Sequence, residues 1–340
     1  MFVGGEERHE VVGRDGGQTA YVEKRFLGAI DKAIASSVTV IPRPIVKRIS
    51  SRYIAGENLE DAVATIQELD KEGCVATVDV LGETSENKAE AAEKLQAYKL
   101  LLDALNEHEL KSGISVKLTG LGLLLDEELC RANLEEIIEY AAERNRFVRV
   151  DMEDSPFTAT TIQIVLDMHE RHENTGAVIQ AYLRRSLQDV VRLVEAGVSV
   201  RLCKGIYDEP RRIAYKNFHT VRHHYVVLLE ELLRVGVYVG IATHDEHLVM
   251  HALRLIHQLK IPEDRYEFQM LLGVDEELRN ILVGGGHKVR VYVPFGKEWY
   301  EYSTRRLQEN PKIARYVAQD VIGDLKSTVG GSFLNRKPAS

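Results

Sequence analysis

The sequence predicts an α/β protein folded as a closed, TIM-like (β/α)8 barrel. From about Glu72 onward one theme recurs eight times: a short run rich in β-branched residues, a polar or glycine turn, and an amphipathic stretch of helical period. No long polar linker divides these units. The turn after the first strand reads Leu81-Gly82-Glu83-Thr84 and lacks the glycine fingerprint of a dinucleotide-binding sheet. A closed barrel is therefore favoured over an open, doubly wound sheet.

The predicted strands are short apolar runs, as expected for parallel strands that are buried on both faces. They cover residues 74–79, 114–118, 147–151, 177–181, 198–203, 237–242, 266–269 and 288–293.

The predicted helices alternate with these strands and carry recognisable start and stop signals. Ser155-Pro156 and Asp245-Glu246 are typical helix starts, and Gly197 and Gly236 mark helix ends before the next strand. The helices cover residues 87–106, 126–144, 157–172, 187–196, 211–235, 246–259, 275–283 and 297–309.

Two further segments flank the predicted barrel. Residues 1–70 are expected to form helices that pack on the barrel, because one apolar face recurs with helical period at Leu59, Ala62, Val63, Ile66 and Leu69. The barrel itself is expected to cover residues 71–310. Residues 311–340 are expected to form a C-terminal helix and a flexible tail.

Composition and charge exclude several classes of protein. The 340 residues are 44% hydrophobic and 28% charged, which is typical of a globular chain. A net charge of −8 disfavours a nucleic-acid partner. The N-terminus does not resemble a secretory signal, and no apolar run approaches the roughly 20 residues needed to span a bilayer. The three scattered cysteines fit a reducing compartment. We expect a cytoplasmic protein, with at most peripheral membrane contact.

Polar side chains stand at the carboxyl end of every predicted strand, where barrels of this class carry out their chemistry. Barrel rims are commonly polar and Asp often caps a helix, so no single residue decides the matter. Together, the eight ends indicate a functional site. The residues are Asp79, Lys117, Asp151, Gln180, Arg201 with Lys204, Thr243 with His244, Gln269, and Tyr292.

The last predicted barrel helix carries a second polar cluster. Tyr302 precedes Arg305 and Arg306 by three and four residues, and Glu309 follows them by four and three, so these side chains share one neighbourhood. A salt-bridged surface helix would explain the pattern. Two adjacent arginines, which point about 100° apart, could equally hold a carboxylate from two sides.

A metal site is a weaker interpretation. His244 is expected at a strand end, whereas His247 and His251 would lie in the following helix, so the three do not form an obvious ligand set. The glycines of 284–286 precede the eighth strand and therefore belong to the opposite end of the barrel. We predict no metal.

Several motifs, taken in order, resemble the proline dehydrogenase family. The likeness runs from about Ala55 to Pro311 and is to the short, monofunctional bacterial type. The resemblance implies a distorted (β/α)8 barrel that holds FAD non-covalently, oxidises L-proline to Δ1-pyrroline-5-carboxylate and passes electrons to a quinone. The motifs are Ile179-Gln180-Ala181-Tyr182, the run from Arg201 to Tyr207, Ala242-Thr243-His244, Glu267-Phe268-Gln269, and Val289 to Gly296 with Arg305-Arg306.

The resemblance also implies roles for individual residues. Lys117, Arg305 and Arg306 would clamp the substrate carboxylate, with Asp151 as the partner of Lys117. The residues implied as walls of the substrate ring are Tyr207, Leu271, Tyr292 and Tyr302. The residues implied for FAD are Gln180, Arg201, Lys204, Gly205, Thr243, His244 and Gln269, with Glu309 near the arginines. The histidine-rich stretch 216–224 departs from the family pattern, and no flavin contact is assigned there.

The implied chemistry is physically coherent. An amine transfers hydride to a flavin only when its nitrogen lone pair is free, and an ammonium has none. Two arginines and a lysine around one carboxylate leave positive charge in excess, which should lower the pKa of the bound amine. Arg201 would stabilise the negative charge that develops on the flavin.

Three alternatives remain at this point. The same scaffold could prefer hydroxyproline, although the bulky phenol of Tyr292 leaves little room for a ring hydroxyl. A metal-dependent barrel hydrolase could use His244 and His247. A catalytically inactive barrel could serve as an interaction module, but this would leave the Arg305-Arg306 cluster unexplained.

Overall fold

The computed structural model describes residues 43–82 and 84–309 of the chain. By their contacts, residues 47–302 form one compact unit, and residues 43–46 and 303–309 belong to a second. Most of the flank predicted at 1–70 and all of that at 311–340 lie outside the described residues. The three-part division of the chain therefore stays a prediction.

Eight parallel strands form a closed barrel in which each strand pairs with the next and β8 pairs with β1. The prediction of a (β/α)8 barrel is confirmed. The strands are β1 (Val75–Val80), β2 (Gly113–Val116), β3 (Val148–Val150), β4 (Thr175–Gln180), β5 (Ser199–Cys203), β6 (Val239–Ala242), β7 (Tyr266–Leu271) and β8 (Val289–Phe295).

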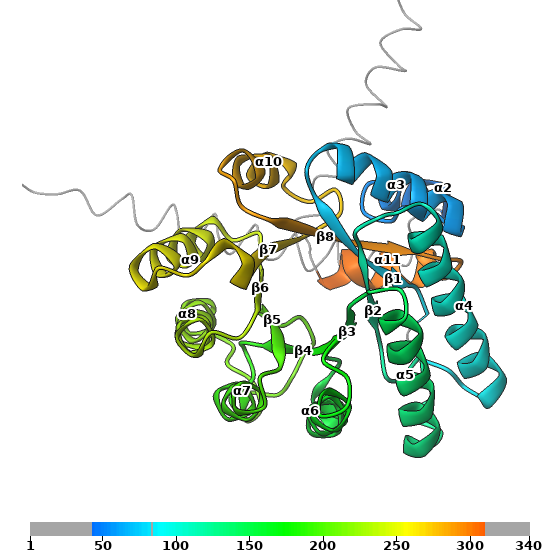
Figure 1. Ribbon diagram of the computed structural model, residues 1–340, viewed down its shortest axis with the longest axis horizontal. Helices are drawn as coiled ribbons and strands as arrows, with labels where there is room; N and C mark the ends of the chain where they lie inside the picture. The colour runs from blue at the N-terminus through cyan, green and yellow to red at the C-terminus, as the bar shows by residue number, and fades with distance from the viewer. Residues whose placement is uncertain (1–42, 83, 310–340) are drawn as a thin grey trace, which may run out of the picture. The chain divides into compact units, whose positions relative to one another are not determined.

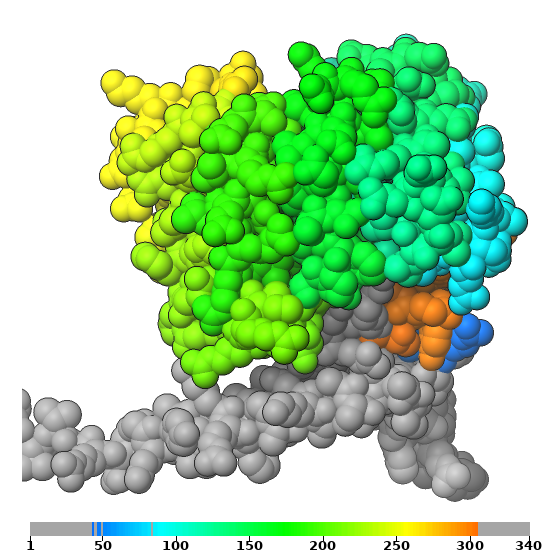
Figure 2. Space-filling model, turned by 90° about the horizontal axis from the view of Figure 1, so that it is seen from below, coloured from blue at the N-terminus to red at the C-terminus, as the bar shows by residue number. Residues whose placement is uncertain are grey.

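The helices of residues 59–284 surround these strands (Figure 1). Figure 2 shows the side chains of α5, α6 and α7, in green, as a continuous outer surface. The helices are α2 (Arg43–Ser50), α3 (Leu59–Lys71), α4 (Lys88–Glu107), α5 (Glu127–Ala142), α6 (Ser155–His169), α7 (Ser186–Glu195), α8 (Phe218–Val235), α9 (Glu246–Leu259), α10 (Glu276–Gly284) and α11 (Trp299–Glu309), with one 3-10 turn, η2 (Glu263–Arg265).

The apolar core lies between the strands and this layer of helices. Strand residues such as Val78, Ile114 and Val291 are fully buried there. Of the apolar face predicted for α3, Leu59 is partly buried and the other four residues are buried, and α3 packs against β1 and β8. None of the described helices is both long and apolar enough to cross a membrane.

One predicted helix begins later than expected. The prediction starts it at residue 211, but α8 begins at Phe218, where the side chain of Asn217 accepts a hydrogen bond from the backbone N–H of Thr220 at 3.0 Å. The preceding residues belong to a loop in which Ala214 forms an isolated bridge with Leu183. The sequence pattern places residues 211–217 in the helix because it cannot show this contact with Leu183, which is distant in the chain.

Candidate active site

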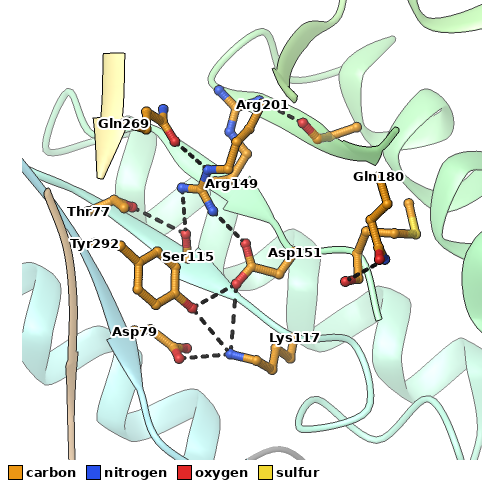
Figure 3. Close-up of polar contacts among 12 residues, drawn as sticks. Thr77, Asp79, Ser115, Lys117, Arg149, Asp151, Gln180, Arg201, Gln269 and Tyr292 are labelled. Atoms are coloured by element: carbon orange, nitrogen blue, oxygen red, sulfur yellow. Dashed lines mark hydrogen bonds and ion pairs between the residues drawn. The ribbon is translucent and has the colours of Figure 1, made fainter. Parts of the chain in front are cut away.

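Polar and charged side chains line the interior of the barrel. On β8, Val289, Val291 and Val293 belong to the buried apolar layer, whereas Arg290 and Tyr292 alternate with them and make polar contacts to other strands. Barrels of this class usually fill the interior with branched apolar residues. Figure 3 shows the resulting network, whose members come from or directly follow β1, β2, β3, β5, β7 and β8.

Lys117 directly follows β2 and is held between carboxylates. Its Nζ lies 2.7 Å from Asp79 Oδ2 and 3.7 Å from Asp151 Oδ2, and it donates a hydrogen bond of 3.4 Å to the hydroxyl of Tyr292. Burial alone would lower the pKa of Lys117, but Asp79, Tyr292 and Asp151 outweigh burial and hold the pKa well above its ordinary value. Lys117 is therefore a fixed cation at neutral pH.

The nearest partner of Lys117 differs from the expected one. The family resemblance implies Asp151, and the structure brings Asp151 to 3.7 Å from Lys117 Nζ, but Asp79 is closer, at 2.7 Å. The reason is strand order, because Asp79 on β1 is in register with Ser115 of the adjacent strand β2, two residues before Lys117. The role of Asp79 could have been inferred from its place at the first strand end.

Asp151 links Tyr292 to Arg201. Its Oδ2 accepts a hydrogen bond of 2.9 Å from the Tyr292 hydroxyl, and its Oδ1 accepts one of 2.7 Å from Arg201 Nη1. Burial, together with the charges of Asp151 and Asp79, raises the pKa of Tyr292 well above its ordinary value. The phenol therefore keeps its proton and has a fixed direction.

The guanidinium of Arg201 is held by three different side chains. Besides Asp151, Arg201 donates from Nε to Gln269 Oε1 at 2.5 Å and from Nη2 to Ser115 Oγ at 3.1 Å. Its guanidinium carbon lies 5.4 Å from the centre of the Tyr292 ring. A planar group held on three sides by other side chains has little freedom to rotate, so Arg201 presents a preorganised positive charge.

Glu267 orients Gln269 and thereby Arg201. Glu267 is only 1% exposed, and its Oε1 accepts a hydrogen bond of 2.6 Å from Gln269 Nε2. Burial alone would raise the pKa of Glu267, but Arg290, Lys288 and the hydroxyl of Tyr238 hold it well below its usual range. An ionised carboxylate only accepts, so it selects the NH2 end of Gln269 and turns the amide oxygen toward Arg201.

Gln180, the last residue of β4, has one unsatisfied atom. Its Nε2 donates to the backbone oxygens of Met152 and Glu153 at 3.2 and 2.8 Å. Its Oε1 is buried and accepts no hydrogen bond from the described residues. A buried acceptor of this kind is costly unless a ligand or water supplies a donor.

Gly205 follows β5 at a place where no side chain fits. Its φ is +100°, and a Cβ atom there would lie 2.1 Å from the ring of Tyr182. Both the backbone angle and this close approach require glycine. This glycine therefore permits the tight turn that follows β5, the strand that carries Arg201.

Lys204 and Thr243 are connected through Asp245. The carboxylate of Asp245 accepts from Lys204 Nζ at 3.2 Å and from both Arg222 Nε and Nη2 at 2.7 and 2.5 Å. Its backbone N–H donates to Thr243 Oγ1 at 3.0 Å. The sequence identified Asp245 only as a helix start and assigned nothing to the stretch 216–224, which contains Arg222.

The three histidines of the hydrolase alternative, His244, His247 and His251, are held by other contacts. His244 Nε2 accepts a hydrogen bond of 3.0 Å from the backbone N–H of Leu271, so in a neutral ring the proton is on Nδ1. His247 and His251 pack edge to face on α9, with ring centres 4.6 Å apart. This arrangement gives no support to the hydrolase alternative.

The remaining predicted residues are described only in part. Tyr302 is 7% exposed, and Tyr207 and Leu271 are half-buried near the ends of β5 and β7. The backbone of α11 carries Arg305, Arg306 and Glu309, but the side chains of these three residues lie outside what the structure describes. The carboxylate clamp therefore stays a prediction.

The chain resembles proteins of known activity over most of its length. A family model described as proline dehydrogenase matches residues 62–319. Proline dehydrogenase 1 of Bacillus subtilis (strain 168) is 35% identical over 271 residues, which are 80% of this chain and 90% of that protein. Proline dehydrogenase of Deinococcus radiodurans is 33% identical over 311 residues, which are 86% of this chain and 99% of that protein.

A solved structure shows the same relationship. The crystal structure of proline utilization A (PutA) from Bdellovibrio bacteriovorus, inactivated by N-propargylglycine, superposes with a TM-score of 0.73 at 26% identity. The match covers 78% of this chain and 33% of the PutA chain, so this protein corresponds to about a third of that longer one. On the family model and the bacterial relatives, the chain belongs to the proline dehydrogenase family.

Proposed function

We propose that this protein oxidises L-proline to Δ1-pyrroline-5-carboxylate, uses FAD as its hydride acceptor and passes the electrons on to a quinone. The observation that carries the proposal is the connected network of Lys117, Asp79, Asp151, Arg201 and Tyr292. It lies at or near the carboxyl ends of the strands in a chain of this family.

The described part of the network is balanced in charge. Lys117 and Arg201 contribute two positive charges, and Asp79 and Asp151 contribute two negative charges. A proline carboxylate that approached Lys117 would therefore meet no excess of positive charge from these four residues. We infer that Arg305 and Arg306 supply this excess, which binds the carboxylate and disfavours a protonated amine.

Several described residues fit a bound flavin. The unsatisfied Oε1 of Gln180 would accept a hydrogen bond from the ring N–H of an isoalloxazine. Arg201, whose direction is fixed by Asp151 and Gln269, would stabilise negative charge on the flavin. Gly205 lets the chain turn without a side chain near the site. When bound, FAD would supply the two-electron acceptor that no side chain provides.

Tyr292 favours proline over hydroxyproline as the substrate. Its hydroxyl donates to Asp151 and accepts from Lys117, so the phenol has no freedom to swing aside for a substituent on the ring. Tyr207, Leu271 and Tyr302 would complete an apolar wall that excludes water from the reacting atoms.

An absorbance spectrum of the purified protein tests the proposal. We expect the visible absorption bands of an oxidised flavin. These bands should disappear when L-proline is added without oxygen and return when a soluble quinone is then added. A colourless protein that does not take up added FAD would refute the proposal. Bleaching without recovery by quinone would refute only the assignment of the acceptor.

A further inference from the structure

A cavity of about 790 Å³ opens at the amino-terminal ends of the strands, opposite the candidate active site. Its outer lining includes Ser199, Tyr238 and Lys288, which begin or directly precede strands. Its inner end reaches Arg201 and Gln269. The cavity has the volume of a small-molecule site.

Cations outnumber carboxylates in the lining of this cavity. Seven of the lining residues carry formal charges: Arg149, Arg201, Arg265, Lys288 and Arg290 are positive, and Glu173 and Glu267 are negative. Arg201 is paired with Asp151, and Arg290 and Lys288 share Glu267. Positive charge is therefore left in excess on the lining.

Arg149 is the buried cation without a counter-charge. It is 4% exposed, and no carboxylate within the described ranges pairs with it. Its Nη1 donates to the backbone oxygens of Ala177 and Ser199 at 2.9 and 2.7 Å, and its Nη2 donates to Ser199 Oγ at 2.9 Å. Burial, with the charges of Arg201 and Arg290, lowers the pKa of Arg149 to about 9, so it remains charged at neutral pH.

The strands are shaped to accept this arginine. Gly176 is in register with Arg149 on the neighbouring strand, and a Cβ atom at Gly176 would lie 2.5 Å from Arg149 Nη1. The guanidinium carbon also lies 4.7 Å from the ring centre of Phe147. A buried cation that pairs only with neutral acceptors is expensive to keep charged, and a bound anion would offset this cost.

We propose that this cavity is a binding site for a small oxyanion, such as phosphate or a carboxylate, with Arg149 as its principal cation. A guanidinium binds carboxylate and phosphate oxygens well because it can donate two parallel hydrogen bonds from one plane. Lys288, whose side chain is 45% exposed, lies on the lining and draws anions toward it. The cavity opens at the other end of the barrel from Lys117, and its inner end meets the proposed flavin site at Arg201 and Gln269.

The test uses the full chain saturated with FAD, because bound FAD would prevent the titrated anions from binding at the proposed flavin site. Phosphate, sulfate, acetate and citrate are titrated at 0–10 mM and constant ionic strength, with chloride as the reference anion, and the Tm is followed. A specific site predicts a saturable Tm increase of about 2–4 °C with one of the oxyanions and none with chloride. The comparison among the four anions distinguishes phosphate chemistry from carboxylate chemistry.

Variants locate the effect. Arg149→Gln should abolish the saturable increase, whereas Arg192→Gln, the same change at an exposed position of α7, should preserve it. Lys288→Gln should raise the anion concentration of half-maximal effect several-fold, and it keeps the test decisive if Arg149→Gln does not fold. No saturable increase in the wild type, or an equal increase in Arg149→Gln, or an unchanged titration in Lys288→Gln, would overturn the proposal.

Discussion

Replacing Glu267 by Gln tests whether the polar interior holds the barrel together. The substitution keeps the shape of the side chain and removes its charge. Glu267 is 1% exposed and accepts from Arg290 at 2.5 and 3.0 Å and from the Tyr238 hydroxyl at 2.7 Å. Without Glu267, Arg290 would be a largely buried cation with no counter-charge among these contacts. Removal of one partner of a buried ion pair costs about 3–5 kcal/mol.

The assay is urea unfolding followed by circular dichroism, with thermal unfolding as a second measurement. We expect the free energy of unfolding to fall by that amount and the Tm by roughly 6–20 °C. The matched control is Lys288→Gln, which removes a partly exposed partner of the same carboxylate and should cost about 1 kcal/mol or less. In the double variant Glu267→Gln, Arg290→Met, the loss should be smaller than the sum of the single losses. Equal costs for Glu267→Gln and Lys288→Gln would refute the reasoning.

The same substitution should change how the free energy of unfolding depends on pH. The pKa of Glu267 is lower in the folded protein than in the unfolded chain, so the unfolded chain binds the proton more readily. The stabilising contribution is therefore complete above the unfolded pKa of about 4.3 and is lost as the pH falls further toward the folded pKa. Glu267→Gln should flatten the acid limb of the stability profile below that pH. An unchanged slope would mean that other carboxylates dominate acid unfolding.

Four further substitutions test the proposed site. Lys117→Met should lower kcat/KM for L-proline by roughly 30-fold or more in steady-state assays, because Lys117 is a fixed cation and its loss also leaves Asp79 unpaired; a change below threefold would contradict its role in the clamp. Arg306→Ala should raise the KM for L-proline strongly, since a charge-assisted contact to a carboxylate is worth several kcal/mol when water is excluded, and an unaltered KM would remove Arg306 from the clamp. Tyr292→Ser should lower the ratio of kcat/KM for proline to kcat/KM for hydroxyproline; an unchanged ratio would show that the phenol does not set specificity. Gly205→Ala should lower the Tm and weaken FAD binding, measured by flavin fluorescence, because φ is +100° and the new Cβ would overlap the ring of Tyr182; normal values of both would show that the turn adapts.

Much of the site could be anticipated because barrel chemistry follows strand ends. Once the strands are located, Lys117, Asp151 and Arg201 stand out as charged residues in or beside apolar runs. The same reasoning passed over Glu267 and Arg149, which lie deeper along their strands and resemble ordinary polar residues within short runs. Charged residues at alternate positions of parallel strands could have been the signal, since such strands are usually apolar throughout.

The sequence by itself determined the order of strands and helices and the residues at the strand ends. Periodicity, capping and turn chemistry are local properties, so they can be read from neighbouring positions in the chain. Only the tertiary structure decided which charges meet. Lys117 and Tyr292 are 175 positions apart, and they come within 3.4 Å because the barrel closes β8 onto β1 and fixes the register of each strand. The register of β1 against β2 likewise makes Asp79 the nearest partner of Lys117, and the fold leaves Arg149 without a carboxylate partner among the described residues.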